Sequence, residues 1–87
     1  MSRSGQQAVI AMRSDEQSTL LARIGRNAKA ERVRAGLLQE DVAHRAALGV
    51  AHYARLERGE INSGVLVYIR VAQALEIPLA ELFRNVP

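Results

Sequence analysis

The chain has 87 residues, of which 48% are hydrophobic, 24% charged and 3% aromatic, and its formal net charge at pH 7 is +3. A chain of this length forms one small domain with a modest core. The absence of cysteine excludes a disulfide framework, a cysteine-ligated zinc site and thiol chemistry. The scarcity of aromatic residues argues against a stacking platform for single-stranded nucleic acid. The small positive charge suits an anionic partner without identifying one.

Residues 1–17 are predicted to form a polar, flexible arm. Serine, glutamine, glycine and arginine are frequent there, and no helix cap or hydrophobic period stands out. The alternative is a short helix over residues 6–13. The longest apolar run near the start, Ala8–Met12, is too short for a signal-peptide core or a membrane span. We therefore expect a cytoplasmic protein that is not associated with a membrane.

Two helices are predicted over residues 18–35 and 37–47. Ser18 can cap the first helix, and Gly36 can end it in the left-handed conformation that glycine adopts readily. The apolar side chains of the first helix recur at intervals of four residues, at Leu20, Ile24 and Ala28. The second helix is expected to turn Val42, Ala43 and Ala46 inward. Its polar residues then face outward.

Three more helices are predicted over residues 50–58, from Ser63 or Gly64 to Leu75, and over residues 79–83. The first of these buries Tyr53 and Leu56 and ends at Gly59. The inward stripe of the second follows helical spacing, at Val65, Tyr68, Ile69, Ala72 and Leu75. Period-two strand patterns and internal repeats are missing. The sequence therefore predicts an all-α domain of five helices, two of them very short, over residues 18–87.

The segment 39–58 carries the feature with most functional information, which is two short helices joined by a short turn. Such a corner can place its second helix in the major groove of DNA, which is wide enough to admit one helix. Many small helical proteins contain a similar corner, so the geometry alone is weak evidence for DNA binding.

The sequence of this corner adds specific motifs. The stretch GLLQEDVAHRAALGVAHYARLERGEIN, followed by ALEIPLAELF, resembles the lambda-repressor-like helix-turn-helix family, also called Xre-type or Cro/repressor-type regulators. The family pattern has Gly-Leu-Ser-Gln-Glu-x-Leu-Ala before the turn, Leu/Ile-Glu-x-Gly at the end of the recognition helix and Ala-Leu-x-Val-Pro-x-x-x-Leu-Phe near the end. The resemblance covers about residues 20–83. It implies a five-helix lambda-repressor-like fold and a transcriptional regulator, of repressor or controller type, that binds double-stranded DNA.

The resemblance also implies roles for individual residues. Gln39 matches a glutamine whose side chain binds a DNA phosphate. The positions that face bases in the recognition helix are Val50, Ala51 and Arg55. The positions that lie near the DNA backbone are His52, Arg58 and Asn62. The ion pair that holds the first and third helices together corresponds to Arg32 and Glu57, whose role is structural more than functional.

Some of these residues also have simpler explanations. Gln39 and Arg55 are alternatively ordinary solvated side chains of surface helices. The basic residues Arg23, Arg26 and Lys29 form either a solvated stripe or a surface that faces phosphates. The two histidines, His44 and His52, lie in different predicted helices with no acidic cluster at ligand spacing. We therefore expect no metal, cofactor or small-molecule substrate.

Several positions depart from the family pattern. Leu38 replaces the usual Ser or Thr cap, a loss of about 1 kcal/mol. Ala47 replaces the glycine of the turn, so a left-handed position carries a Cβ at a cost of roughly 1 kcal/mol. The small residues Gly49, Val50 and Ala51 cannot make bidentate base contacts, although apolar contact with thymine methyl groups remains. Ser63 replaces a common proline. Shape readout or the N-terminal arm can compensate for weak direct readout.

One recognition helix contacts few base pairs, so we expect a homodimer on a palindromic or pseudo-palindromic operator. A candidate interface consists of apolar positions on the fourth predicted helix, at Leu66, Val67 and Val71. Alternatively, these residues simply widen the core. The competing function is an antitoxin-like or adaptor module that binds protein and binds DNA weakly. No Ser/His/Asp set, carboxylate pair or phosphate-binding glycine loop is present, so the protein is not expected to be an enzyme.

Overall fold

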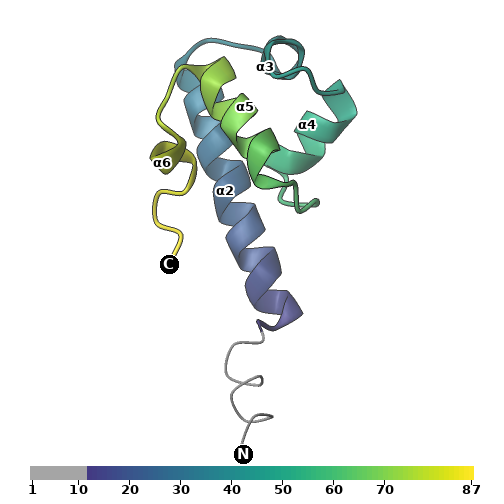
Figure 1. The fold of residues 1–87 in the computed structure, drawn as a ribbon, viewed down its shortest axis with the longest axis vertical. Coiled ribbons are helices and arrows are strands. Elements are labelled where there is room, and N and C mark those ends of the chain that lie inside the picture. The colour runs from purple at the N-terminus through teal and green to yellow at the C-terminus, as the bar shows by residue number, and fades with distance from the viewer. Residues whose placement is uncertain (1–11) are drawn as a thin grey trace, which may run out of the picture.

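The computed structural model describes residues 12–87. Within this range it contains no strand and five helices (Figure 1), namely α2 (Ser14–Arg34), α3 (Gln39–Arg45), α4 (Val50–Glu57), α5 (Val65–Leu75) and α6 (Leu79–Leu82). The prediction of an all-α, five-helix fold is therefore confirmed. No helix in the described range combines the length and the apolar character needed to cross a membrane.

Helix α2 begins earlier than the sequence suggested. Its N-cap is Arg13 rather than Ser18, and the Arg13 backbone N–H donates to Glu16 Oε1 at 3.0 Å. Acidic residues in the first turn also interact favourably with the positive end of the helix dipole, which explains why helix formation reaches back to Ser14. Residues 14–17, expected to belong to the arm, are helical. The alternative helix over 6–13 falls almost entirely outside the described residues.

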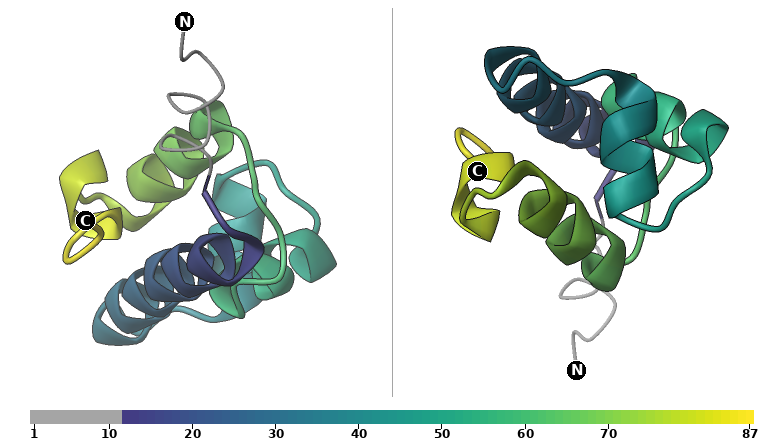
Figure 2. Two further views of the ribbon diagram at one scale, coloured as in Figure 1. Left: turned by 90° about the horizontal axis from the view of Figure 1, so that it is seen from below. Right: turned by 90° about the horizontal axis from the view of Figure 1, so that it is seen from above.

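The core forms where α4, α5 and α6 pack against α2 and α3 packs against α4 and α5 (Figure 1). The inward positions predicted for α3 and α4 are confirmed, because their side chains are almost completely buried. The buried apolar residues are Ile24, Ala28, Val42, Ala43, Ala46, Tyr53, Leu56, Tyr68, Val71, Ala72, Ala74, Leu75 and Leu82. Figure 2 shows that α6 lies on the side of the molecule opposite to α3 and α4.

The buried stripe of α5 differs from the predicted one. Val65 is 58% exposed, whereas Val71 is completely buried. The stripe therefore begins at Tyr68 and continues through Val71, Ala72 and Leu75, at the i, i+3, i+4, i+7 spacing of one helix face. Val65 lies one turn before this stripe and beyond the edge of the core. Val71 was a candidate interface residue, but its burial within one chain assigns it to the core.

Four helices end in the same backbone geometry, in which the residue after the C-cap, or the C-cap itself, is left-handed. At the ends of α2 and α4 this residue is a glycine, with φ of +73° at Gly36 and +71° at Gly59. At the ends of α3 and α5 it carries a side chain, with φ of +57° at Ala47 and +58° at Glu76. The expected left-handed alanine in the helix-turn-helix is thus confirmed.

The N-terminal end of α3 also departs from the usual pattern in the expected way. Leu38 is its N-cap and supplies no side-chain oxygen for the first turn. Instead the Leu38 backbone N–H donates to Asp41 Oδ2 at 2.8 Å. Of the two hydrogen bonds of a capping box, only the one from the N-cap backbone N–H to the acidic side chain remains.

The crossing of α2 and α4 depends on two glycines that permit a close approach. A Cβ on Gly25 would collide with the backbone carbonyl oxygens of Leu56 and Glu57, and a Cβ on Gly59 would lie 2.6 Å from the Cα of Ala22. Any side chain at either position requires the helices to separate. The absence of a side chain at these two glycines therefore allows the C-terminal end of α4 to pack directly against α2.

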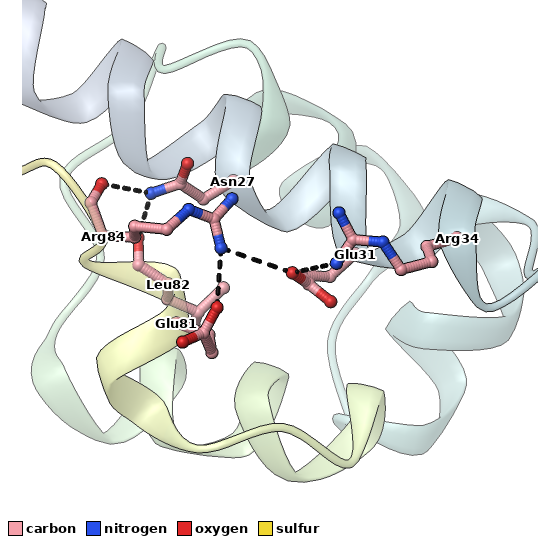
Figure 3. A network of polar contacts seen from close by, with 6 residues as sticks. All are labelled: Asn27, Glu31, Arg34, Glu81, Leu82 and Arg84. Atoms are coloured by element: carbon pink, nitrogen blue, oxygen red, sulfur yellow. Dashed lines mark hydrogen bonds and ion pairs between the residues drawn. The ribbon is translucent and has the colours of Figure 1, made fainter.

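A separate polar network fixes α6 and the residues after it to α2 (Figure 3). The amide nitrogen of the buried Asn27 donates to the carbonyl oxygens of Leu82 and Arg84 at 2.8 and 2.9 Å. The guanidinium of Arg84 lies 2.6 Å from Glu81 and 3.5 Å from Glu31, and Glu31 also pairs with Arg34 at 2.7 Å. This network lies away from the helix-turn-helix.

We expect Gly25→Ala to destabilise the protein by about 2 kcal/mol or more, because overpacking forces the α2–α4 backbones apart. The free energy of unfolding in urea measures the effect. Gly64→Ala is the control, because nothing lies near a Cβ built at Gly64, and its effect should stay below about 1 kcal/mol, the scale of a change at the N-cap of α5. Equal stability of the Gly25→Ala variant and the wild type would show that the helices do not cross this closely.

Candidate nucleic-acid interface

Helices α3 and α4 pack against each other and are joined by the turn at residues 46–49. Helix α4 buries one face through Tyr53, Leu56 and Glu57. Its opposite face is open to solvent, and the exposed residues there are Val50, Ala51, His52, Arg55 and Arg58. All five were predicted to face DNA, so the structure brings them together on one exposed helix surface.

Gln39 is half-buried in the first turn of α3. Its Nε2 donates to Oε1 of Glu57 at 2.9 Å. This contact uses one of two amide protons and leaves the other proton and the carbonyl oxygen available. Gln39 also lines a shallow hollow together with Leu38 and Val50. The structure therefore places the predicted phosphate-binding residue beside the first residue of α4, and holds its amide in a fixed orientation.

The carboxylate that orients Gln39 also makes the ion pair that the resemblance implied. Arg32 donates through Nε to Glu57 Oε2 at 2.6 Å and through Nη2 to Oε1 at 3.1 Å. Both side chains are largely buried, with 12% of Arg32 and 2% of Glu57 exposed. The third donor group of Arg32, Nη1, reaches the carbonyl oxygen of Leu37 at 2.9 Å. One carboxylate thus links α2, α3 and α4.

These contacts shift the pKa values of the linked groups. Burial alone would raise the pKa of Glu57, but the Arg32 guanidinium and the Gln39 amide that donate to it outweigh burial and hold that pKa below its ordinary value. The hydrogen bond to Glu57 raises the pKa of Arg32. Burial, and then the neighbouring carboxylate, raise the pKa of Tyr53. The phenol is neutral and the ion pair is charged at neutral pH.

An acidic residue that the sequence analysis did not single out lies beside the two arginines of α4. Glu60 accepts hydrogen bonds from Nε and Nη2 of Arg58 at 2.9 and 3.0 Å, and its Oε1 lies 4.0 Å from Nε of Arg55. Arg58 lowers the pKa of Glu60, so this carboxylate stays charged. Glu60 follows Arg58 by two residues, in the loop after α4. This spacing was the only sign in the sequence that a carboxylate could pair with Arg58.

The loop after α4 also contacts α4 through His52. Its Nε2 lies 3.2 Å from Oγ of the buried Ser63. Asn62, in the same loop, does not join the hollow around Gln39. It lines a different hollow, with the N-terminal half of α2 and Val86. Within the described residues, no group of three or more histidine, aspartate or glutamate side chains is arranged to hold a metal ion.

We expect Glu57→Gln to lower the free energy of unfolding at pH 7 by about 3 kcal/mol, because Arg32 loses its buried partner. A carboxylate with a depressed pKa adds stability that is present at neutral pH and is lost as pH falls through its folded pKa. Wild-type stability should therefore decline below about pH 5 more steeply than that of the variant. Urea unfolding across this range, with the exposed Glu40→Gln as a charge-matched control, measures the difference. Parallel pH profiles of Glu57→Gln and wild type would contradict the assignment.

Comparison with known proteins agrees with this geometry. A helix-turn-helix family model matches residues 29–82. Among solved structures, the fold is similar to that of the restriction-modification controller protein C.AhdI from Aeromonas hydrophila, at 32% sequence identity and a TM-score of 0.71. That alignment covers 72% of this chain and 96% of the controller protein. A comparison with curated proteins gives no match.

The family model spans more than half of the chain and includes both helices of the predicted corner. The similar solved structure is a controller protein, and the exposed face of α4 has the position that a recognition helix requires. The chain therefore belongs to the lambda-repressor-like, Xre-type helix-turn-helix family of DNA-binding transcription regulators.

Proposed function

We propose that the protein is a sequence-specific transcription regulator of the repressor or controller type, which acts as a homodimer on a palindromic operator in the cytoplasm. The observation that carries this proposal is the exposed face of α4 directly beside Gln39, whose amide is held by Glu57 at 2.9 Å. A preoriented phosphate-binding group beside a solvent-exposed helix is what a major-groove reader needs. The similarity to a controller protein supports the controller type.

In this proposal the residues of the interface divide into two groups. Arg55 reads a base, because a guanidinium can donate two hydrogen bonds to guanine. Val50 and Ala51 make apolar contacts with base edges. The groups that bind the sugar-phosphate backbone, and so set the register of the complex, are Gln39, His52, Arg58 and Asn62. Because the Arg58 guanidinium donates to Glu60 in the free protein, a phosphate must displace that carboxylate or share the guanidinium with it.

The proposed dimer uses the exposed apolar surface at the start of α5. Leu66 is 70% exposed and Val65 is 58% exposed, and Val67 is half-buried next to them. A two-fold interface uses the same patch on both subunits, so a single apolar strip is sufficient. We therefore keep Leu66 and Val67 as interface residues and add Val65. Two recognition helices would then be separated by about 34 Å, one turn of DNA.

Selection of bound duplexes from a random DNA pool tests the proposal. The expected result is a palindromic consensus, together with an affinity that falls steeply as the salt concentration rises. Enrichment of a consensus without two-fold symmetry would contradict the dimer on a palindrome. Weak binding without any sequence preference would instead favour the antitoxin-like or adaptor function.

We expect Arg55→Ala and Gln39→Ala to weaken DNA binding in different ways. Arg55→Ala should cost about 1–3 kcal/mol on the selected operator and relax selectivity at one base position. Gln39→Ala should weaken binding to all duplexes by a similar factor, because a phosphate contact carries no base identity. Titration of both variants with the operator and with single-base variants of it distinguishes these patterns. If Gln39→Ala changed sequence preference, or Arg55→Ala left it unchanged, the assigned roles would be wrong.

Leu66→Glu is expected to shift the protein from dimer toward monomer, because the two-fold axis brings two buried carboxylates together. Sedimentation equilibrium at micromolar to millimolar concentration measures the change. The control is Val33→Glu, which places the same charge on an apolar residue of α2 that is 60% exposed. A wild type that sediments as a monomer, or a Leu66→Glu variant that dimerises as well as Val33→Glu, would rule out this interface.

A further inference from the structure

The turn between α3 and α4 closes with hydrogen bonds that follow a regular helix-ending motif. The Ala47 N–H donates to the carbonyl oxygen of His44 at 3.1 Å, and the Leu48 N–H donates to that of Ala43 at 2.8 Å. Ala47 itself adopts φ of +57°, which is unfavourable for a residue with a Cβ. The motif does not use the carbonyl oxygens of Ala46 and Ala47, which need partners elsewhere.

Both carbonyl oxygens are bound by one side chain from another helix. Arg70, in the middle of α5, donates through Nε to Ala46 O at 2.8 Å and through Nη2 to Ala47 O at 2.8 Å. The two donors belong to one rigid, planar guanidinium, so they fix the two acceptors relative to each other and to α5. The positive charge also lies at the C-terminal end of α3, where the helix dipole favours it.

Arg70 forms no ion pair among residues 12–87, where none of its nitrogens lies within 4.0 Å of a carboxylate oxygen. The position of its guanidinium is therefore not explained by a neighbouring acidic residue. Helices α2 and α4 end at glycines, which adopt positive φ without strain. The turn at Ala47 lacks that freedom. A bidentate clamp on its carbonyl groups stabilises the same conformation by an external contact.

We propose that Arg70 is a positioning residue for DNA recognition, which clamps the strained turn and thereby sets the orientation of α4 relative to α3. This inference rests on the proposed function, because it concerns how α4 meets the operator. The turn is the covalent link between Gln39, on α3, and the base-facing residues of α4. Arg70 fixes the relation between these two parts of the interface, so that both contact the same duplex in register.

The test uses two variants of Arg70 and one matched control. Arg70→Met removes charge and clamp together, whereas Arg70→Lys keeps the charge but cannot present two coplanar donors. Asn27→Ala is the control, because Asn27 also donates to two main-chain carbonyls at 2.8 and 2.9 Å, but on the α6 side of the molecule. Each variant is titrated with the selected operator and with an unrelated duplex across a range of salt concentrations, at a temperature where circular dichroism shows it folded.

We expect both Arg70 variants to lose about tenfold in the ratio of operator affinity to unrelated-duplex affinity, on the scale of one mismatched base pair. Arg70→Lys should leave the salt dependence of unrelated-duplex binding unchanged, because no phosphate contact is lost. Asn27→Ala should keep the wild-type ratio even where it loses stability. The Arg70 assignment is overturned by a wild-type ratio in Arg70→Lys, or by equal losses in Arg70→Lys and Asn27→Ala. A wild type with no sequence preference overturns the proposed function as well, so the two failures are distinguishable.

Two further measurements keep the inference testable if an Arg70 variant fails to fold. In the wild type, nuclear magnetic resonance should show the Arg70 Nε–H protected from exchange and the Ala47 backbone coupling of a positive φ, and an unprotected Nε–H overturns the clamp. Ala47→Gly removes the strain at the turn, so the double variant Ala47→Gly/Arg70→Met should fold better than Arg70→Met and regain part of its affinity ratio. An Arg70→Met variant that Ala47→Gly does not improve contradicts the link between the clamp and the turn.

Discussion

The arrangement of the helix-turn-helix on its supporting helix depends on the carboxylate of Glu57. It is almost completely buried, and burial of a charge is costly unless hydrogen bonds satisfy it. Arg32 and Gln39 supply three such bonds, from α2 and α3. A paired buried carboxylate tolerates few alternative geometries. The same interaction therefore fixes the crossing of the helices and orients the glutamine that is proposed to bind phosphate.

This coupling explains how a recognition helix with small side chains at its start can still serve a DNA-binding regulator. Val50 and Ala51 offer no hydrogen-bond donors to bases, so position contributes more to recognition here than side-chain length. Two contacts fix that position against the neighbouring helices. Glu57, the last residue of α4, binds Arg32 of α2 and Gln39 of α3. Arg70 of α5 binds the carbonyl groups of the turn before α4. In the proposed function, this rigid frame replaces part of the missing direct readout.

Much of this architecture is predictable from the sequence, because local signals agree with the fold. The inward positions of α3 and α4 follow from helical periodicity, and the left-handed Ala47 follows from the resemblance to the family pattern, which has a glycine at that position of the turn. The register of α5 does not, because an almost continuous apolar run from Val65 to Val71 leaves the buried face ambiguous until α3 packs on it. Nor do the contacts of Arg70, since a charged residue in an apolar helix reveals no acceptor 24 residues away along the chain.

Two faces of the C-terminal half of α2 make different contacts, and in the proposed function this separates stability from recognition within a small domain. The face toward α6 is fixed by Asn27, Glu31 and Arg84 (Figure 3). Within residues 12–87, the side chains of these three residues form no hydrogen bond or ion pair with α3 or α4. The other side is fixed by Arg32 through Glu57. We therefore expect substitutions on the α6 side to change the folded fraction alone, and substitutions around Glu57 also to move the proposed DNA-binding groups. The residues that hold α6 and the residue that binds Glu57 lie on one continuous helix. Helix α2 therefore relates the position of the C-terminal segment to the proposed interface only as a rigid support.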